Sequence, residues 1–368
     1  MILQSTGLPD LMFPKLSTTA HLLSSYRLAR LDNRYKRQTC KFDFFLEGNL
    51  GKLQWELQNN RYYPSPYNYF IVSEPKVRHV AAPKFIDRVF HHALVSLIEP
   101  VFERTFISDA YACRRGKGTH YGMKRMKKFL QAARSYHGKE TPIYILQCDI
   151  SKFFSSISWD ILLAQIAKNI TEPKMYSIIT KIVTMHQAYQ RDGRLCPLPP
   201  EVISIADRRG LPIGNLTSQL FANVYLNPLD HFVKETLKER WYGRYMDDFF
   251  IIHSDIDHLL HVRSIIRSYL ANDLHLILHP RKSSINNVKN GVAFLGYRVF
   301  YDHVLIRGNT LQRYQRKLYR KRKLVATGKA TKEELEWMER SFDGHLRYAR
   351  TYHLKSTLQT STEMVNLK

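Results

Sequence analysis

Acidic residues are scarce in this sequence: of 368 residues, 32 are Asp or Glu and 56 are Lys or Arg, which gives a formal net charge of +24. An imbalance of this size favours a polyanionic partner. Wholesale disorder is excluded, because 44% of the residues are hydrophobic and 12% are aromatic, enough to bury a sizeable core.

Cysteines and long apolar runs are also scarce. No CxxC pair and no Cys/His cluster has the spacing of zinc ligands, so reduced thiols in a cytoplasmic protein are expected. No stretch approaches the roughly 18 uninterrupted apolar residues of a membrane helix, and the first residues lack the pattern of a secretion signal. We found neither an internal repeat nor a low-complexity tract. The four cysteines are Cys40, Cys113, Cys148 and Cys196.

What the sequence does contain is acidic residues at the ends of predicted strands. Residues 143–148 have strand composition and end on Asp149, and a helical pattern follows over residues 159–167. Residues 240–254 read as two short strands that flank Met246-Asp247-Asp248. The sequence therefore predicts a hairpin with two acids at its bend and a separate strand that delivers a third.

Three carboxylates with apolar flanks need a partner, because a buried carboxylate costs several kcal/mol unless something pairs with it. If they converge, two Mg²⁺ ions about 3.5 to 4 Å apart would neutralise them and support nucleotidyl transfer. The alternative for each motif alone is structural: Asp247-Asp248 as an ordinary turn, and Asp149 as a helix cap.

Other segments predict the surrounding elements. Strands are expected within residues 69–80, a helix over residues 86–102, and helices after residue 305, with a capping box at Thr331 and Glu334. Seven uncompensated cations on the first C-terminal helix predict contact with RNA or a hybrid duplex and strongly salt-dependent binding, the alternative being a solvated face. These cations are Arg313, Arg316, Lys317, Arg320, Lys321, Arg322 and Lys323.

Several motifs resemble those of reverse transcriptases. Tyr245-Met246-Asp247-Asp248 is similar to their YxDD signature, and residues 149–154 are similar to their first-aspartate motif. Similar blocks follow the same order from about residue 70 to 305, so the resemblance covers most of the chain. These blocks are residues 78–83 with Asp87-Arg88 and residues 111–118, both fingers blocks, then residues 211–219, and residues 294–297, the primer grip.

The resemblance implies an α+β right-hand polymerase with fingers, a palm built on an antiparallel sheet, and a short helical thumb. The implied domains are an N-terminal helical extension (1–60), fingers (61–142), a palm (143–305) with a fingers-side insertion around 160–210, and a basic thumb (306–368). No protease, endonuclease or RNase H segment is expected, because the thumb takes up the residues after the palm.

The implied activity is RNA-directed DNA polymerisation with two Mg²⁺ ions and deoxynucleoside triphosphates. The implied partners are a template RNA, the RNA/DNA hybrid, and an accessory protein or second reverse transcriptase subunit, without a membrane. A DNA-binding, cytoplasmic enzyme is expected.

The resemblance also assigns roles to individual residues. Lys282 would act as a general acid near the leaving pyrophosphate, the alternative being a solvated lysine. Phe154 would be the steric gate that rejects a 2′-hydroxyl, although a core aromatic is the competing reading and Phe153 could be confused with it. The metal residues would be Asp149, Ile150, Asp247 and Asp248; the nucleotide contacts Lys76, Arg78, Phe154, Ile213, Gly214 and Gln219; and the nucleic-acid contacts Arg114, Arg115, Lys117, Gly296, Tyr297 and the thumb cations.

One block departs from the commonest pattern of the superfamily. Most reverse transcriptases carry Gln and Pro where Ile213 and Gln219 stand here. This departure resembles the enzymes of bacterial diversity-generating retroelements and their group II intron-like relatives, and it implies error-prone copying of adenine. The alternatives are a phage-defence enzyme that copies a noncoding RNA and, in another class, a catalytically inactive RNA-binding protein, against which the three intact acids argue.

Overall fold

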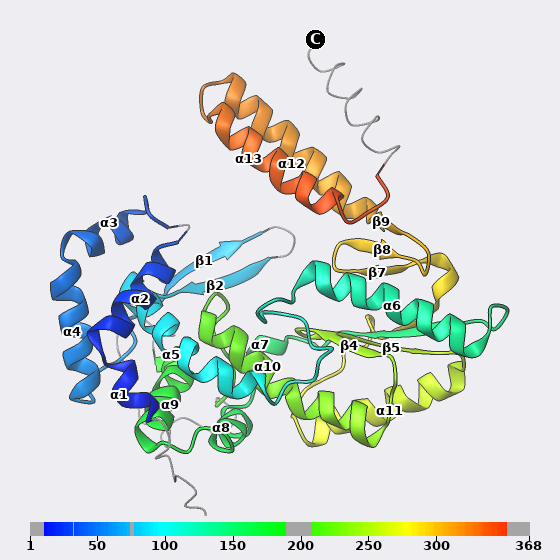
Figure 1. Ribbon diagram of the computed structural model, residues 1–368, viewed down its shortest axis with the longest axis horizontal. Coiled ribbons are helices and arrows are strands. Elements are labelled where there is room, and N and C mark those ends of the chain that lie inside the picture. Colours follow the sequence, from blue (N-terminus) through cyan, green and yellow to red (C-terminus); the bar gives the residue numbers. More distant parts are fainter. Residues whose placement is uncertain (1–10, 32, 74–76, 189–207, 352–368) are drawn as a thin grey trace, which may run out of the picture. The chain divides into compact units, whose positions relative to one another are not determined.

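The structure is a computed structural model that describes residues 11–31, 33–73, 77–188 and 208–351 (Figure 1). The chain forms two compact units. The first comprises Met1–Ile107, Ile150–Phe232 and Ile266–His279, and the second comprises Ser108–Asp149, Val233–Ile265 and Pro280–Lys368. Each unit therefore combines stretches that are far apart in the sequence. The predicted boundaries between extension, fingers, palm and thumb stay a prediction.

The first unit is mainly helical. Aromatic side chains join its N-terminal helices to α5: the Tyr26 ring stacks on Phe42 at 5.7 Å, and Phe42 meets Phe85 edge-on at 5.1 Å. The helix predicted over residues 86–102 is confirmed as α5, and the one over residues 159–167 as α8. The helices are α1 (Met12–Leu16), α2 (Thr19–Arg30), α3 (Arg37–Phe44), α4 (Leu46–Gln58), α5 (Phe85–Glu103), α7 (Phe153–Ser156), α8 (Trp159–Ala167), α9 (Pro173–Ala188) and α10 (Leu216–His231).

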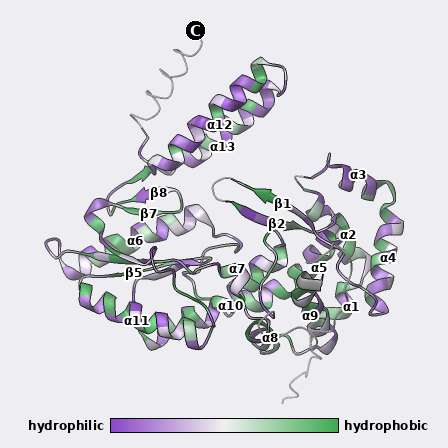
Figure 2. Ribbon diagram, turned by 180° about the vertical axis from the view of Figure 1, so that it is seen from behind, coloured by the Kyte–Doolittle hydropathy of each residue, from purple (hydrophilic) through white to green (hydrophobic). Residues whose placement is uncertain are grey.

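The predicted strands within residues 69–80 form a two-stranded antiparallel ribbon of the first unit. Strand β1 (Asn68–Val72) pairs with β2 (Arg78–Ala82) in a register that runs from Asn68↔Ala82 to Val72↔Arg78. All five residues of β1 are exposed, although Figure 2 colours much of this strand as hydrophobic. The ribbon is thus anchored through β2, whose Ala81 is buried.

The second unit contains an antiparallel sheet of four strands in the order β4-β5-β3-β6. In Figure 1, α6 (Thr119–His137) runs along one side of this sheet. Helix α11 (Ile256–Asn272) runs along the other side, with its residues up to Ile265 in this unit. The strands are β3 (Tyr144–Cys148), β4 (Tyr242–Tyr245), β5 (Asp248–His253) and β6 (Ser284–Asn287).

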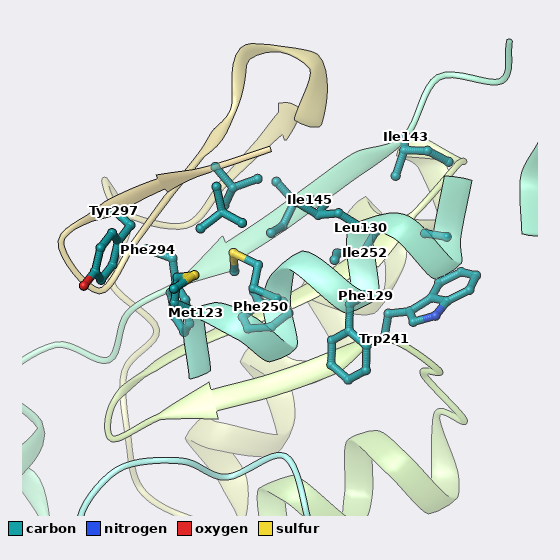
Figure 3. Close-up of a cluster of buried hydrophobic side chains, with 14 of the residues drawn as sticks. Met123, Phe129, Leu130, Ile143, Ile145, Trp241, Phe250, Ile252, Phe294 and Tyr297 are labelled. Carbon is teal, nitrogen blue, oxygen red and sulfur yellow. The ribbon is translucent and has the colours of Figure 1, made fainter. Parts of the chain in front are cut away.

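A buried cluster fixes α6 on the sheet (Figure 3). Met123 and Phe129 of α6 face Ile145 of β3 and Phe250 of β5, and Phe250 also meets the ring of Phe294 edge-on at 5.2 Å. Burying these large apolar side chains away from water stabilises the packing of α6 on the sheet. The sheet that carries the predicted acids is therefore backed by a rigid helix.

The C-terminal part of the second unit begins with a small sheet in the order β7-β8-β9, formed by β7 (Val292–Phe294), β8 (Tyr297–Val299) and β9 (Val304–Ile306). Helices α12 (Gly308–Ala326) and α13 (Lys332–Leu346) follow, and they pack through the stacked rings of Tyr314 and Phe342, whose centroids are 3.5 Å apart. Thr331 and Glu334 form the predicted capping box at the start of α13. Short helical segments also lie at Phe232–Thr236 and Val288–Asn290.

Within the described ranges, none of the helices has the length and apolar character needed to cross a bilayer. Cys40, Cys113 and Cys148 are free thiols, whereas Cys196 lies outside the described residues.

Candidate active site

The strand register of the second unit brings two of the predicted acids together. Strands β3 and β5 pair antiparallel up to Cys148↔Phe249, so Asp149, the next residue after β3, lies beside Asp248, the first residue of β5. Residues opposite each other on such strands have Cβ atoms about 5 Å apart. The predicted convergence of a strand end and a hairpin tip is therefore what the register produces.

The hairpin between β4 and β5 supplies the third acid. Its last pair is Tyr245↔Asp248, which leaves a two-residue turn of Met246 and Asp247. Met246 has φ of 58°, the left-handed backbone that tight hairpin turns require. The turn is one residue shorter than expected, because Asp248 already belongs to the strand. Asp247 therefore projects from the bend itself, and Asp248 starts the paired strand.

A buried arginine supports this bend from within the unit. Arg244 is fully buried, and its Nη1 donates a hydrogen bond to the carbonyl oxygen of Met246 (3.0 Å). Its backbone pairs with a separate segment: Arg244 N–H donates to Asp109 C=O, and Tyr111 N–H donates to Arg244 C=O, both at 2.9 Å. At the neighbouring Gly243, an added Cβ would lie 2.6 Å from the Tyr111 hydroxyl, so only glycine fits this close approach.

Asp109 is in turn held by side chains. It forms an ion pair with Arg125 (Nε to Oδ1, 2.8 Å) and accepts a hydrogen bond from the Tyr111 hydroxyl (3.0 Å). Burial and the adjacent Asp109 raise the pKa of Tyr111, so the hydroxyl stays protonated and can donate. Arg244, Asp109 and Arg125 were not predicted from the sequence. An arginine inside an otherwise apolar strand next to paired acids was the available signal.

The acids of the site repel one another. Burial, then the charges of Asp247 and Asp149, raise the pKa of Asp248 to about 7, and a hydrogen bond with Asp149 acts in the same direction. Lys282 supplies a positive charge beside them: its Nζ lies 2.7 Å from Oδ2 of Asp149. The structure thus brings Lys282 together with Asp149, although its role as a general acid stays a prediction.

Carboxylate oxygens are the ligands that Mg²⁺ prefers, and mutual repulsion is what a divalent cation would relieve, so the chemistry of this donor set fits a metal. As the side chains lie, however, no group of three or more His, Cys, Asp or Glu residues in the described ranges could hold a metal ion. Asp149 instead forms an ion pair with Lys282. Ile150 has a buried apolar side chain, so only its backbone could contribute a ligand.

The candidate steric gate belongs to the first unit. Phe153 is buried with 2% exposure, whereas Phe154 is half-buried, which identifies Phe153 as the core aromatic of the pair. The carbonyl oxygen of Phe154 accepts a hydrogen bond from Leu211 N–H (2.7 Å). This bond ties the first-aspartate motif to the block at residues 211–219.

The other candidate nucleotide contacts of the first unit lie around β2. Ile213 C=O accepts a hydrogen bond from Ala81 N–H (2.8 Å), and Arg78 is exposed at the start of the same strand. Gly214 precedes α10 and Gln219 lies in its second turn. Lys76 lies outside the described residues. Strand β2 therefore contains Arg78 and lies against Ile213 and Gly214. The contact of these residues with a nucleotide stays a prediction.

Two of the three cations in the basic loop at residues 114–118 form hydrogen bonds with backbone carbonyls of the same unit. Arg114 is buried, and its Nη1 donates to Ala110 C=O (2.8 Å), while Lys117 Nζ donates to Ser108 C=O (2.6 Å). Arg115 is exposed. The loop therefore offers Arg115 more openly than Arg114 to a nucleic acid.

The predicted primer-grip turn lies between β7 and β8. Leu295 and Gly296 both have positive φ, and Tyr297 is buried with its hydroxyl 2.9 Å from Nδ1 of His345. Burial raises the pKa of Tyr297. The Tyr297 side chain is therefore committed to α13, and Gly296 is the more open of the two predicted contacts.

The expectation of seven uncompensated cations on α12 is wrong in part. Lys321 pairs with Glu334 (2.8 Å), and Arg322 pairs with Glu339 (3.2 Å), both acids of α13. Charge counted along one helix does not include the acids that the antiparallel neighbour α13 brings to it. Arg313, Arg316, Lys317, Arg320 and Lys323 lie on exposed positions of the same helix.

Comparison with known proteins adds to this geometry. The family described as reverse transcriptase (RNA-dependent DNA polymerase) matches residues 72–299, more than half of the chain. Protein YkfC of Escherichia coli (strain K12) is 24% identical over 281 residues, which cover 67% of this chain and 70% of YkfC. The group II intron-encoded protein LtrA of Lactococcus lactis subsp. cremoris is 25% identical over 202 residues, 52% of this chain and 29% of LtrA.

Among solved structures, the apo telomerase of Candida tropicalis matches with a TM-score of 0.51 and 12% identity. The match covers 68% of this chain and 50% of that chain. At this identity the likeness concerns the fold alone, and it supports the predicted right-hand polymerase architecture. The chain spans half of that telomerase chain and less than a third of LtrA.

Proposed function

The chain belongs to the reverse transcriptase family, and from this premise we propose that it copies RNA into DNA with Asp149, Asp247 and Asp248 as the metal-binding acids. One observation carries the proposal: the β3–β5 register and the two-residue turn gather these acids at one end of a sheet within the matched region. The raised pKa of Asp248 is consistent with a site that favours a multivalent cation.

Magnesium would supply the electrostatic clamp on the attacking and leaving oxygens of an in-line displacement, held by Asp149, Asp247 and Asp248. The chain's own residues would bind and orient the substrates. Lys282, which stands at Asp149, would deliver a proton or positive charge toward the leaving pyrophosphate. Arg78 would hold the triphosphate through its guanidinium, and Phe154 would exclude the 2′-hydroxyl.

The test is a primer-extension assay on an RNA template with labelled deoxynucleotides and Mg²⁺. Asp247→Asn should abolish incorporation while RNA binding stays unchanged and the melting temperature does not fall, because the substitution removes a repelling charge and no packing. Asp257→Asn, an exposed acid in the first turn of α11, is the matched control and should keep activity. Full incorporation by Asp247→Asn, or none by the wild-type protein, would refute the proposal.

For the biological setting, we propose a diversity-generating retroelement that copies a dedicated RNA template with an accessory protein or second subunit. Ile213 supports this, because an apolar side chain replaces an amide that can hydrogen-bond near the incoming nucleotide. The alternative is a defence-associated enzyme that copies a noncoding RNA. A template and variable repeat pair that differ at adenines in the neighbouring DNA would support the first setting, and a structured noncoding RNA without such repeats would support the second.

A further inference from the structure

Residues 210–215 form a short segment of the first unit that is hydrogen-bonded on two sides. Leu211 N–H donates to Phe154 C=O (2.7 Å), and Ile213 C=O accepts from Ala81 N–H of β2 (2.8 Å). The segment therefore links the backbone of the candidate steric gate to the strand that begins at Arg78. Whatever fixes this segment also fixes the spacing between these two nucleotide contacts.

Asn215 ends the segment at the N-cap of α10. Asparagine at this position ordinarily accepts a hydrogen bond from a first-turn N–H group, but here its side chain does not cap the helix. Its Nδ2 donates instead to the hydroxyl of Tyr67, just before β1, at 2.8 Å. Both residues are buried, with 1% and 7% exposure. The amide is thus committed to a contact between segments that are distant in sequence.

The same turn has several locally unfavourable features. Asn215 Oδ1 and Thr217 Oγ1 are buried without a hydrogen-bond partner in the described part of the chain. Gly214 has φ of 117°, and an added Cβ would lie 2.9 Å from Cγ1 of Val80. A buried orphan acceptor and a left-handed backbone both oppose folding, and departures of this kind concentrate where position matters more than stability.

We propose that Tyr67 and Asn215 are positioning residues for nucleotide selection. Their hydrogen bond holds the segment at residues 210–215 against β1 and β2, which sets where Ile213 and the Phe154 backbone meet a deoxynucleotide. Neither residue needs to touch the nucleotide. The inference rests on the proposed polymerase function and extends it to Tyr67, which lies outside the family blocks, and to Asn215, a position in the block at residues 211–219 to which no role was assigned.

Tyr67→Phe tests the pair, because it removes one hydroxyl and keeps the ring. In primer extension we expect the KM for deoxynucleotides to rise about three- to tenfold with kcat within about twofold, the size of one lost buried hydrogen bond. Discrimination against ribonucleotides should fall by a similar factor. Asn215→Ala should change KM and sugar discrimination by similar factors. The double variant should change them no more than the more affected single variant, because both substitutions remove the Tyr67–Asn215 hydrogen bond.

Tyr26→Phe is the matched control. Tyr26 is also 7% exposed, and its hydroxyl donates to Asp43 at 2.6 Å, within the same unit but among the N-terminal helices. It should lower the melting temperature without changing KM or sugar discrimination. Asn215→Asp lacks the Nδ2 donor to Tyr67 and places a carboxylate at a site with 1% exposure, so it should lose selectivity as Asn215→Ala does.

The results distinguish a failure of the positioning role from a failure of the proposed polymerase function. An active wild-type enzyme whose Tyr67→Phe and Asn215→Ala variants keep the same KM and discrimination would overturn the positioning role alone. So would a Tyr26→Phe variant that changes both parameters as much as Tyr67→Phe. A wild-type protein that incorporates nothing would overturn the polymerase proposal and this inference with it.

Discussion

Replacing His91 by leucine should remove a large part of the acid sensitivity of the first unit. His91 lies on α5 with 1% exposure, and its Nε2 has no hydrogen-bond partner among the residues described. Burial, with a smaller contribution from His92, lowers the pKa of His91 from 6.5 to about 3. In the folded protein this imidazole is therefore neutral at pH 5 and above.

The sign follows from the two states. Below pH 6.5 the unfolded chain takes up a proton at His91 and the folded chain does not, so stability is complete above this pH and is lost as the pH falls toward 3. Between pH 7 and pH 5 the loss amounts to about 2 kcal/mol, at roughly 1.4 kcal/mol for each pH unit below the unfolded pKa. Leucine has a similar volume and no ionisable group, so the variant should escape this loss.

Urea unfolding at pH 7 and pH 5 measures the effect. Other titrating groups are shared by the two proteins and cancel in the comparison, so the free energy of unfolding of His91→Leu should gain about 2 kcal/mol on the wild type as the pH falls from 7 to 5. The slope against urea should stay the same. An equal difference between the proteins at both pH values would refute the assignment of a neutral, buried imidazole.

Two other predictions concern the candidate active site. Burial, followed by the charges of Asp247 and Asp149, raises the pKa of Asp248 to about 7, so ionising this group in the folded protein costs stability as the pH rises from about 4 through 7. Asp248→Asn should therefore raise the melting temperature in EDTA at pH 8. The gain should shrink at pH 5, whereas Asp273→Asn, an exposed acid elsewhere, should show no such trend. A gain that does not depend on pH would contradict the raised pKa of Asp248. Phe154→Ala should allow ribonucleotide incorporation in primer extension while Phe153→Ala mainly destabilises the fold, since only Phe153 is buried; unchanged sugar discrimination in Phe154→Ala would remove the steric-gate role.

Much of the local structure around the acids could be predicted from the sequence. The β-branched and aromatic run at residues 143–148 and the two short runs that flank Met246-Asp247-Asp248 are strong short-range signals, and both became strands of one sheet. Helix α6 was not predicted. Its buried Met123, Met126 and Leu130 do recur at helical spacing, but Gly122 and many cations obscure the pattern.

The contacts that position the site were less accessible to sequence reasoning. The pairing of Lys282 with Asp149 and that of Asn215 with Tyr67 each join residues more than a hundred positions apart, and no local propensity specifies them. The acids of α13 that neutralise Lys321 and Arg322 were visible in the sequence, but the antiparallel packing that brings them together was not. Tertiary structure decides such pairs, and periodicity within one element does not.

The anchoring of Arg244 beneath the acidic bend limits how this chain can be recombined with related polymerases. Its backbone forms hydrogen bonds with Asp109 and Tyr111, and its guanidinium contacts Met246. The hairpin and the segment from Ser108 to Tyr111 therefore have to be exchanged together. A chimera that exchanges the hairpin alone would bury a guanidinium against a foreign loop. Donor fragments for this site therefore have to be chosen as matched pairs from a single parent.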